Sequence, residues 1–440
     1  MGSARMQNAI AMTTDRPVTD TSRAGIATVL FLGLTCGVQM SDRGLQSILS
    51  PAIRATFDVG DAVMGALHGI AGILIASALA IPLARLADRH SRKRILLALI
   101  AAWTLLTLLG ALAPNFAWFF AGRAAAGITE FAMIPIVYSL IPDLVGERMR
   151  VAANLSFAAL MALGASAGFY LGGDLLALMG GLEGVGWLGH LEPWRRTMAL
   201  LALGGLPLLA LGALTLDPPR QTSVSAASGA ASLPGFVRAH LRQMLLFVGA
   251  AGGIAIAVQA LVPMIAMALE RRYAADLGGV GHTLGILTFA GTMLSLPVAW
   301  IVDRTLRGRL GLRARPALMG AATALAVPCA ALLAFAPTTS AALAMTGAFL
   351  LTTCIANALI PTMLQDLAPV ALRARAFAAY SFLIAAFCAV GPLLAGGISQ
   401  FLLADDLLSA IALAAVPPMA LTLVCTALWC LRPDAPTHAS

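Results

Sequence analysis

Four ionisable residues stand inside or at the edge of long apolar stretches of this 440-residue chain. Asp42 and Arg43 lie at the end of the first such stretch, and Arg123 and Glu130 lie within a later one. A charged side chain in hydrocarbon costs roughly 2.5–3.5 kcal/mol even on the mildest scale. Such residues are retained where they face a polar cavity or pair with one another, so these four are the first candidates for chemistry.

The chemistry open to carboxylates beside guanidinium groups is reversible protonation. Burial raises the pKa of a carboxyl group and a nearby arginine lowers it, so the two effects can leave the group able to exchange protons. Arg123 and Glu130 are seven residues apart, which places them on one helix face about 10 Å from each other. We expect Asp42 and Glu130 to couple protons to a conformational change; the alternative is a fixed ion pair between helices. For Arg123, a structural role and a proton-gating role both stay open.

The elements that hold these residues are membrane helices. The chain is 60% hydrophobic and 11% charged, whereas soluble domains have about 25% charged residues, which excludes an ordinary water-soluble enzyme. Apolar runs long enough to span a bilayer, about 20 residues, recur throughout. We predict an all-α membrane protein with twelve transmembrane helices, at about 24–45, 62–84, 95–113, 117–140, 151–174, 197–216, 243–269, 282–302, 317–336, 341–364, 376–400 and 407–431.

The distribution of basic residues predicts the orientation. With the N-terminus in the cytoplasm, 21 of the 28 lysines and arginines fall in cytoplasmic segments and only five in outer ones. Cytoplasmic connections carry the excess of positive charge in membrane proteins. We therefore place the chain in the inner (plasma) membrane with both termini cytoplasmic. This also explains the net charge of +8 without a nucleic-acid partner.

The chain divides into two similar halves of six helices. Asp88-Arg89 after the second helix matches Asp303-Arg304 after the eighth, and Asp143-Leu144 after the fourth matches Asp366-Leu367 after the tenth. A parallel repeat implies a pseudo-two-fold axis along the membrane normal with a site between the halves. The predicted parts are an N-terminal tail (1–23), a six-helix bundle (24–216), a cytoplasmic linker (217–241), a second bundle (242–431) and a C-terminal tail (432–440).

Several local motifs resemble those of one family. The loop 84–94, ARLADRHSRKR, resembles the signature loop of the major facilitator superfamily, and the segments 123–127 and 164–173 resemble two further motifs of that superfamily. Within it the chain is most similar to Spinster-like transporters. The residues that carry this similarity are Asp42-Arg43, Gly127 to Glu130 with Pro135, Trp194-Arg195, Asp217 to Arg220, Gln365-Asp366, Arg373 to Ala376 and Gly391-Pro392.

The resemblance implies roles for particular residues. The first and fourth helices of each such protein line a central cavity, which implies that Arg43 pairs with Glu130 and that Asp42 lies beside them. It also implies a cytoplasmic gate in which Asp88 contacts the start of the eleventh helix near Ala376. We assign Asp88, Arg89 and Arg92 to this gate, although Arg92 also serves topology. Polar residues that we assign to a possible substrate cavity are Gln39, Tyr138, Gln259 and Asn357.

These features predict a secondary active transporter that works by alternating access. Because the helices of the second half carry almost no charge, the cavity should be polar on one side and apolar on the other. That suits an amphipathic organic solute, which we expect to be exported in a proton-coupled reaction. The alternative is a proton-symport importer of an organic acid or a chelator-type small molecule, with an arginine meeting its carboxylate.

Other classes find less support in the sequence. A membrane enzyme or a receptor is the third hypothesis, but the chain has no HExxH, GxSxG or GxxxxGK[ST] motif. The six cysteines all fall in apolar runs without CxxC spacing, which favours packing over metal binding. His68 is more simply a hydrogen-bonded buried histidine than a proton carrier. We expect no cofactor and no metal, a small-molecule substrate, protons and the lipid bilayer as partners, and a monomer.

Overall fold

The computed structural model describes residues 23–79, 91–182, 184, 189–215, 233–369 and 372–431. Within these ranges every regular element is a helix. Eleven helical stretches are long and apolar enough to cross a membrane, and one of them, Leu277–Leu333, contains two helices joined by a tight turn. The prediction of an all-α membrane protein is confirmed, and the structure is consistent with twelve crossings.

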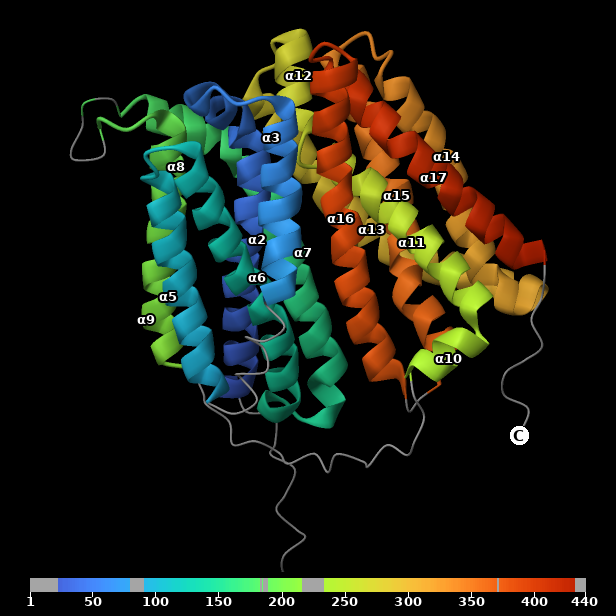
Figure 1. Cartoon of the computed structure of the whole chain (residues 1–440). Helices are drawn as coiled ribbons and strands as arrows, with labels where there is room; N and C mark the ends of the chain where they lie inside the picture. The colour runs from blue at the N-terminus through green and yellow to red at the C-terminus, as the bar shows by residue number, and fades with distance from the viewer. Residues whose placement is uncertain are drawn as a thin grey trace, which may run out of the picture.

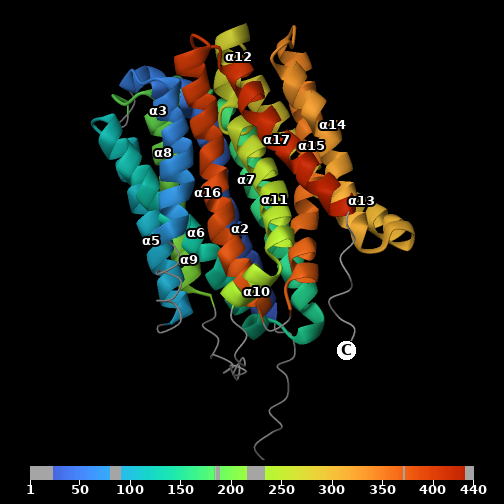
Figure 2. The same cartoon turned by 45° about the vertical axis from the view of Figure 1, so that its right-hand side comes forward.

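The helices form two bundles that lie side by side (Figures 1 and 2). The first bundle contains α2 (Arg23–Phe57), α3 with η1 (Asp61–Ala66 and Leu67–Ile75), α5 (Arg92–Ala111), α6 (Phe116–Leu144), α7 (Arg150–Gly180), and α8 with α9 (Pro193–Leu203 and Gly205–Ala213). The second contains α11 with α12 (Leu241–Leu261 and Ile265–Tyr273), α13 (Leu277–Leu310), α14 (Ala314–Leu333), α15 (Thr339–Leu367), α16 (Arg373–Leu402) and α17 (Leu407–Leu431).

Short helices fill the connections. They are η2 (Glu147–Met149), α10 (Leu233–Ala239) and η3 (Gly311–Arg313). The last part of the predicted linker thus forms α10, and the rest of the linker lies outside the described residues. The exact boundaries of the predicted domains stay a prediction.

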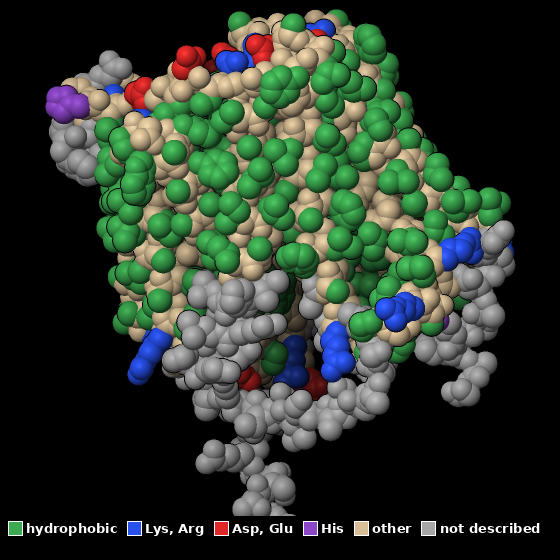
Figure 3. All heavy atoms as spheres, viewed as in Figure 1, with side chains coloured by type: hydrophobic (Ala, Val, Ile, Leu, Met, Phe, Trp, Pro, Cys, Tyr) green, Lys and Arg blue, Asp and Glu red, His purple; other side chains and the backbone are tan. Residues whose placement is uncertain are grey.

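Hydrophobic side chains cover the middle of the face shown in Figure 3, and charged side chains lie above and below this band. We call the face at which α2 begins and α17 ends the lower face, as oriented in Figure 1, and the opposite one the upper face. Many large apolar side chains inside the long helices are exposed, such as Leu155 of α7 at 59% and Leu325 of α14 at 64%. Exposed apolar side chains on membrane-length helices are what a lipid environment requires.

The first helix is longer than its apolar run predicts. It continues from Arg23 to Phe57, so Asp42 and Arg43 lie near its middle and not at its end. The second half of α2 has low hydropathy because its polar side chains face other helices. Ser47, for example, is fully buried and donates a hydrogen bond to the carbonyl oxygen of Pro263 at 3.1 Å.

Glycines on α7 bring α2 and α7 into backbone contact. A Cβ atom on Gly164 would lie 2.0 Å from the carbonyl oxygen of Gly37, and one on Gly168 would lie 1.9 Å from that of Ser41. Any larger residue would therefore push the two helices apart. This contact fixes the rotation of α2, which turns Asp42 and Arg43 toward α6.

Candidate functional site

The centre of the first bundle contains a buried ion pair between α2 and α6. Arg123 donates from Nη1 to Asp42 Oδ2 at 2.8 Å and from Nη2 to Gln46 Oε1 at 3.4 Å. The side chains of Asp42 and Arg123 are only 1% and 5% exposed. Because each charge is shielded from solvent, each depends on the other for its stabilisation.

A second ion pair lies next to the first and reaches the surface of the bundle. Arg43 Nε donates to Glu130 Oε2 at 3.3 Å. Glu130 is 1% exposed, whereas the side chain of Arg43 is 35% exposed. The second oxygen of Glu130, Oε1, is buried without a hydrogen-bond partner among the described residues. The pairing of Arg43 with Glu130 that the family resemblance implied is present, with Asp42 beside it.

Phe131 links this site to the second bundle. The guanidinium of Arg43 stacks over its ring, 4.5 Å from the centroid. The same ring packs against a small cluster that contains Ile73 of η1 and Ala385 and Ala389 of α16. A movement of α16 relative to the first bundle would therefore change the surroundings of Arg43.

His68 lies deeper in the first bundle. Its Nε2 is 3.0 Å from Ser50 Oγ, and both side chains are buried. It belongs to η1, a stretch of π-helix, and such stretches are frequent at functional sites. The hydrogen bond agrees with the simpler interpretation of a satisfied buried histidine.

The two bundles meet closely at the upper face through Asp61, the first residue of α3. Its carboxylate is fully buried and accepts from Arg54 of its own bundle at 3.0 Å. From the second bundle, Arg271 donates to both oxygens at 2.7 Å and Ser399 donates at 2.6 Å. The hydrogen bond with Asp61 raises the pKa of Arg271, so this arginine stays charged.

We call Asp61 and its three donors, Arg54, Arg271 and Ser399, the clamp. Sequence reasoning missed it. Arg54 and Arg271 were counted only as outer-loop charges, and Asp61 was not singled out. Asp61 and Arg271 are 210 residues apart, so no local spacing connects them. The only signal was an acidic residue at a helix start followed by an apolar run.

Backbone contacts close the same face around the clamp. A Cβ atom on Gly65 of α3 would lie 2.3 Å from the carbonyl oxygen of Pro392 in α16, and one on Gly173 of α7 would lie 2.4 Å from Gly278 in α13. At the lower side, Figure 3 shows a hollow between the bundles with basic and acidic side chains visible in it. The described contacts between bundles therefore gather toward the upper face.

The four residues assigned to a substrate cavity differ in burial. Gln39 is 1% exposed and its Nε2 is buried without a partner among the described residues, and its assignment to a possible substrate cavity stays a prediction. Tyr138 is 42% exposed and packs edge-on against Phe157. Gln259 is half-buried and Asn357 is exposed, both on the second bundle.

The predicted cytoplasmic gate is described only in part. Asp88 and Arg89 lie outside the described residues. Arg92 forms an ion pair with Asp143 and donates to the carbonyl oxygen of Ser139 at 2.8 Å. Both partners belong to α6, so these contacts join two helices of the first bundle and do not bridge to the second.

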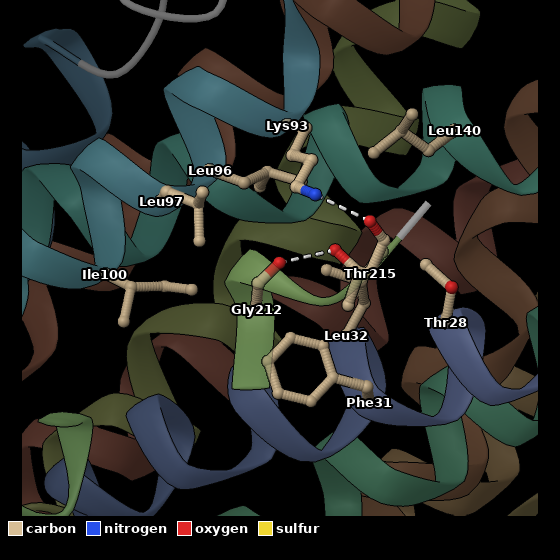
Figure 4. Close-up of a pocket in the computed structure, with 10 residues that line it drawn as sticks. All are labelled: Thr28, Phe31, Leu32, Lys93, Leu96, Leu97, Ile100, Leu140, Gly212 and Thr215. Carbon is tan, nitrogen blue, oxygen red and sulfur yellow. Dashed lines mark hydrogen bonds between the residues drawn. The ribbon is translucent and has the colours of Figure 1, made fainter. Parts of the chain in front are cut away.

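Lys93, next to Arg92 in the sequence, has a structural role. Its Nζ donates to the carbonyl oxygens of Ala213 and Thr215 at the end of α9, at 2.8 and 2.6 Å, and Figure 4 shows it pointing at Thr215. A cation stabilises the unpaired carbonyls at a helix C-terminus. The pocket drawn there has a volume of only about 10 Å³, which is too small for a solute.

A larger cavity of about 300 Å³ lies between α2, α7 and α8. Ser41 is the only polar side chain among its lining residues, and exposed leucines such as Leu34 and Leu163 border it. None of the four charged residues lines it, and the hydroxyl of Ser41 already donates to the carbonyl oxygen of Val38. The ion-pair cluster is therefore the stronger candidate site.

The sequence matches the model of the Major Facilitator Superfamily over residues 31–392. The chain belongs to this superfamily. Members of the superfamily are membrane transporters that bind small-molecule substrates, which makes this chain a multi-pass membrane transporter.

Individual relatives cover parts of the chain. The Drosophila melanogaster protein named Protein spinster is 28% identical over 169 residues, which is 38% of this chain and 26% of that protein. The cephamycin export protein CmcT of Amycolatopsis lactamdurans is 27% identical over 257 residues, 54% of this chain and 50% of that protein. The matches thus span half or less of these relatives.

Solved structures share the fold over nearly the whole chain. A bacterial homologue of the human lysosomal transporter Spinster, in an inward-facing and unoccupied conformation, superposes with a TM-score of 0.77 at 19% identity and covers 92% of this chain and 95% of that one. The nucleoside transporter NupG superposes with a TM-score of 0.67 at 13% identity, covering 93% and 99%. The resemblance to Spinster-like transporters within the superfamily is confirmed.

Proposed function

We propose that this chain is a proton-coupled secondary transporter that exports an amphipathic organic solute by alternating access. We further propose that it acts as a monomer in the inner membrane, with the lower face toward the cytoplasm. The observation that carries the proposal is the second ion pair. Glu130 is buried, its partner Arg43 is partly exposed, and the two lie where the bundles touch.

Protonation of Glu130 supplies the coupling step. An ionised carboxylate with one unpaired oxygen in a buried site is unfavourable, and a bound proton removes the charge. The proton also removes most of the attraction between Glu130 and Arg43. Arg43 can then turn toward Asp42 or toward an anionic group of the solute, and this changes its stacking on Phe131.

That change reaches the second bundle through contacts already described. Phe131 touches α16, and α16 supplies Ser399 to the clamp around Asp61. With the upper face held shut by this clamp, the conformation corresponds to one open toward the cytoplasm. Deprotonation of Glu130 would restore its pairing with Arg43 and shift the balance between the two openings.

The chemistry of the two bundles favours an amphipathic solute. Arg43 offers a positive charge at the edge of the first bundle, beside the aromatic ring of Phe131. Across from it, the cluster on α16 consists of small apolar side chains and Cys388. A molecule with one polar or anionic end and an apolar body fits that contrast, and the similarity to an export protein supports the outward direction.

The test starts from a thermal-shift screen of purified protein against lipids, drugs, organic acids and chelates at pH 5.5 and 8. The strongest ligand is then used, radiolabelled, in proteoliposomes with an imposed pH step. We expect solute to accumulate on the acidic side, because protons moving down their gradient exchange for solute. Glu130→Gln should lose the pH response and most of the driven flux, because the amide cannot take up or release the coupled proton.

The matched control is Glu192→Gln, which neutralises an exposed acid (46% exposed) away from the site. It should keep both the flux and the pH response. If Glu130→Gln and Asp42→Asn both transported as the parent does, with the same pH response, the coupling role of this cluster would be refuted.

The same assay separates the alternative function. A symport importer of an organic acid or chelator is compatible with the partial exposure of Arg43, which could meet a carboxylate. In symport the solute accumulates on the side opposite to the acidic compartment. The sign of the pH step that drives accumulation therefore distinguishes export by exchange from import by symport.

A further inference from the structure

The lower end of α13 extends beyond the hydrocarbon part of a membrane. The helix has 34 residues, which corresponds to a length of about 51 Å, whereas the hydrocarbon core of a bilayer is about 30 Å thick. Figure 2 shows its lower end and the turn into α14 projecting from the edge of the second bundle, away from the first. This turn therefore meets the membrane at its surface.

An apolar face of α13 leads down to that level. Leu296 and Ile301 are 52% and 53% exposed, and Trp300 is 62% exposed. Exposed apolar side chains at the outside of the bundle face lipid tails. Tryptophan is enriched where tails give way to headgroups, so Trp300 marks the boundary and the residues after it lie among headgroups.

Five arginines follow Trp300, and they fall into two groups. Arg307 and Arg315 form ion pairs with Asp303 and Asp366. The other three, Arg304, Arg309 and Arg313, are exposed and have no acidic partner among the described residues. The positive charge of this turn is thus only partly neutralised by the protein.

Exposed apolar side chains alternate with the unpaired arginines along the end of α13 and the turn. The guanidinium of Arg304 lies over the ring of Trp300, 5.5 Å from its centroid. Leu310 and Leu312 are 42% and 69% exposed on the same turn, which Gly311 closes with a φ of 58°. Exposed leucines beside free arginines match a surface where headgroup phosphates and acyl chains meet; a soluble partner would leave these leucines in water.

We propose that the turn at the lower end of α13, with its three exposed arginines Arg304, Arg309 and Arg313 and the stack of Arg304 on Trp300, binds the phosphate headgroups of anionic phospholipids in the leaflet at the lower face. Guanidinium groups bind phosphate oxygens through paired hydrogen bonds. The stacked Arg304 is held in place before binding. The site is separate from the ion-pair cluster and does not depend on which solute is transported.

Native mass spectrometry of the full-length protein tests this site. The detergent-purified protein is titrated with dioleoylphosphatidylglycerol, with dioleoylphosphatidylcholine and with soluble glycerol 3-phosphate. We expect preferential binding of phosphatidylglycerol, and a loss of about tenfold or more in the affinity of one phosphatidylglycerol in the variant Arg304→Gln/Arg309→Gln/Arg313→Gln. Each basic residue near an anionic lipid contributes on that scale.

The control variant removes the same charge elsewhere on the lower face. Arg94→Gln/Arg238→Gln/Arg242→Gln changes three exposed arginines and should leave this binding step unchanged. Equal losses in both variants would show a general effect of charge and would overturn the proposal, as would no loss in the first variant. Binding of glycerol 3-phosphate that competes fully with the lipid would identify a soluble phosphate ligand and would also overturn it. None of these outcomes involves transport, so they are independent of the proposed function.

Discussion

Asp42 and Arg123 form an ion pair with almost no contact with solvent. Burying two charges costs free energy that their attraction only partly offsets, and a charge left alone in such a place is more costly still. The pair is thus a weak source of net stability but a strict constraint on which side chains can occupy these positions. Glu130 differs, because its partner is partly exposed and one of its own oxygens is unpaired.

The burial of both charges of the Asp42–Arg123 pair predicts the result of a double-mutant cycle. Arg123→Met leaves the carboxylate of Asp42 buried without its partner and should destabilise the protein by about 3–5 kcal/mol. The double variant Asp42→Leu/Arg123→Met removes both charges and should recover most of that stability. Thermal unfolding in detergent at pH 7.5 provides the measurement. Equal losses in the single and double variants would mean that the uncompensated charge is not the cause.

At the scale of elements, glycine contacts decide how the helices pack. Gly164 and Gly168 bring α7 onto the backbone of α2, and this contact orients the helix that carries Asp42 and Arg43. Further glycines place α3 against α16 and α7 against α13. The packing of small residues is therefore what positions the charged ones.

Gly168→Ala tests this packing. Its Cβ atom would meet the carbonyl oxygen of Ser41 at 1.9 Å, so α2 and α7 must separate, at a cost of about 1–3 kcal/mol. Gly397→Ala in α16 is the control, because a Cβ atom there would have nothing within 4 Å. We expect a lower melting temperature for Gly168→Ala and an unchanged or slightly higher one for Gly397→Ala. The reverse order would contradict this packing model.

At the scale of the whole molecule, the clamp around Asp61 joins the two bundles at the upper face. One buried carboxylate receives donors from α2, α12 and α16. The backbone N–H of Ala62 also donates to the side-chain Oε1 of Gln400 at 3.0 Å. Opening this face requires all the donors from the second bundle to leave Asp61, so the clamp sets part of the free-energy difference between the two openings.

Two adjacent arginines allow a matched test of the clamp. Arg271→Gln removes the bond to Asp61 between bundles, whereas Arg272→Gln removes only an exposed ion pair with Asp406 inside the second bundle. Spin labels at Asp58→Cys and Ala404→Cys, in a background without the six native cysteines, report the distance across the upper face. We expect a population with longer distances for Arg271→Gln and none for Arg272→Gln. Unchanged distances in both variants would show that the clamp does not control this face.

Much of the fold could be predicted because hydrocarbon imposes a simple rule. Every long apolar run became a helix, since backbone groups in a membrane must bond within their own segment. The first helix was predicted too short because its second half, from Gly44 to Phe57, carries polar groups that face other helices. Hydropathy measures the environment of an average helix surface and cannot detect polar groups satisfied inside a bundle.

The charged residues of the candidate site could also be predicted from the sequence, but their role could not. Charges in apolar runs identified Asp42, Arg43, Arg123 and Glu130, and the pairing of Arg43 with Glu130 followed from family resemblance. Their role in proton coupling stays a prediction. The assignment of Gln39 to a substrate cavity also stays a prediction, because the sequence of a helix alone does not show which way a polar residue faces.

The sequence by itself determined which segments enter the membrane and which charges must find partners there, because both follow from the local cost of exposing polar groups to lipid. Only the tertiary structure decided which residues pair with these charges. Asp61 and Arg271 meet because α3 begins and α12 ends at the same face. The three unpaired arginines of α13 and η3 can be recognised only once Arg307 and Arg315 are seen to pair with the nearby acids. Contacts between residues hundreds of positions apart depend on how the bundles pack, and no local pattern encodes that.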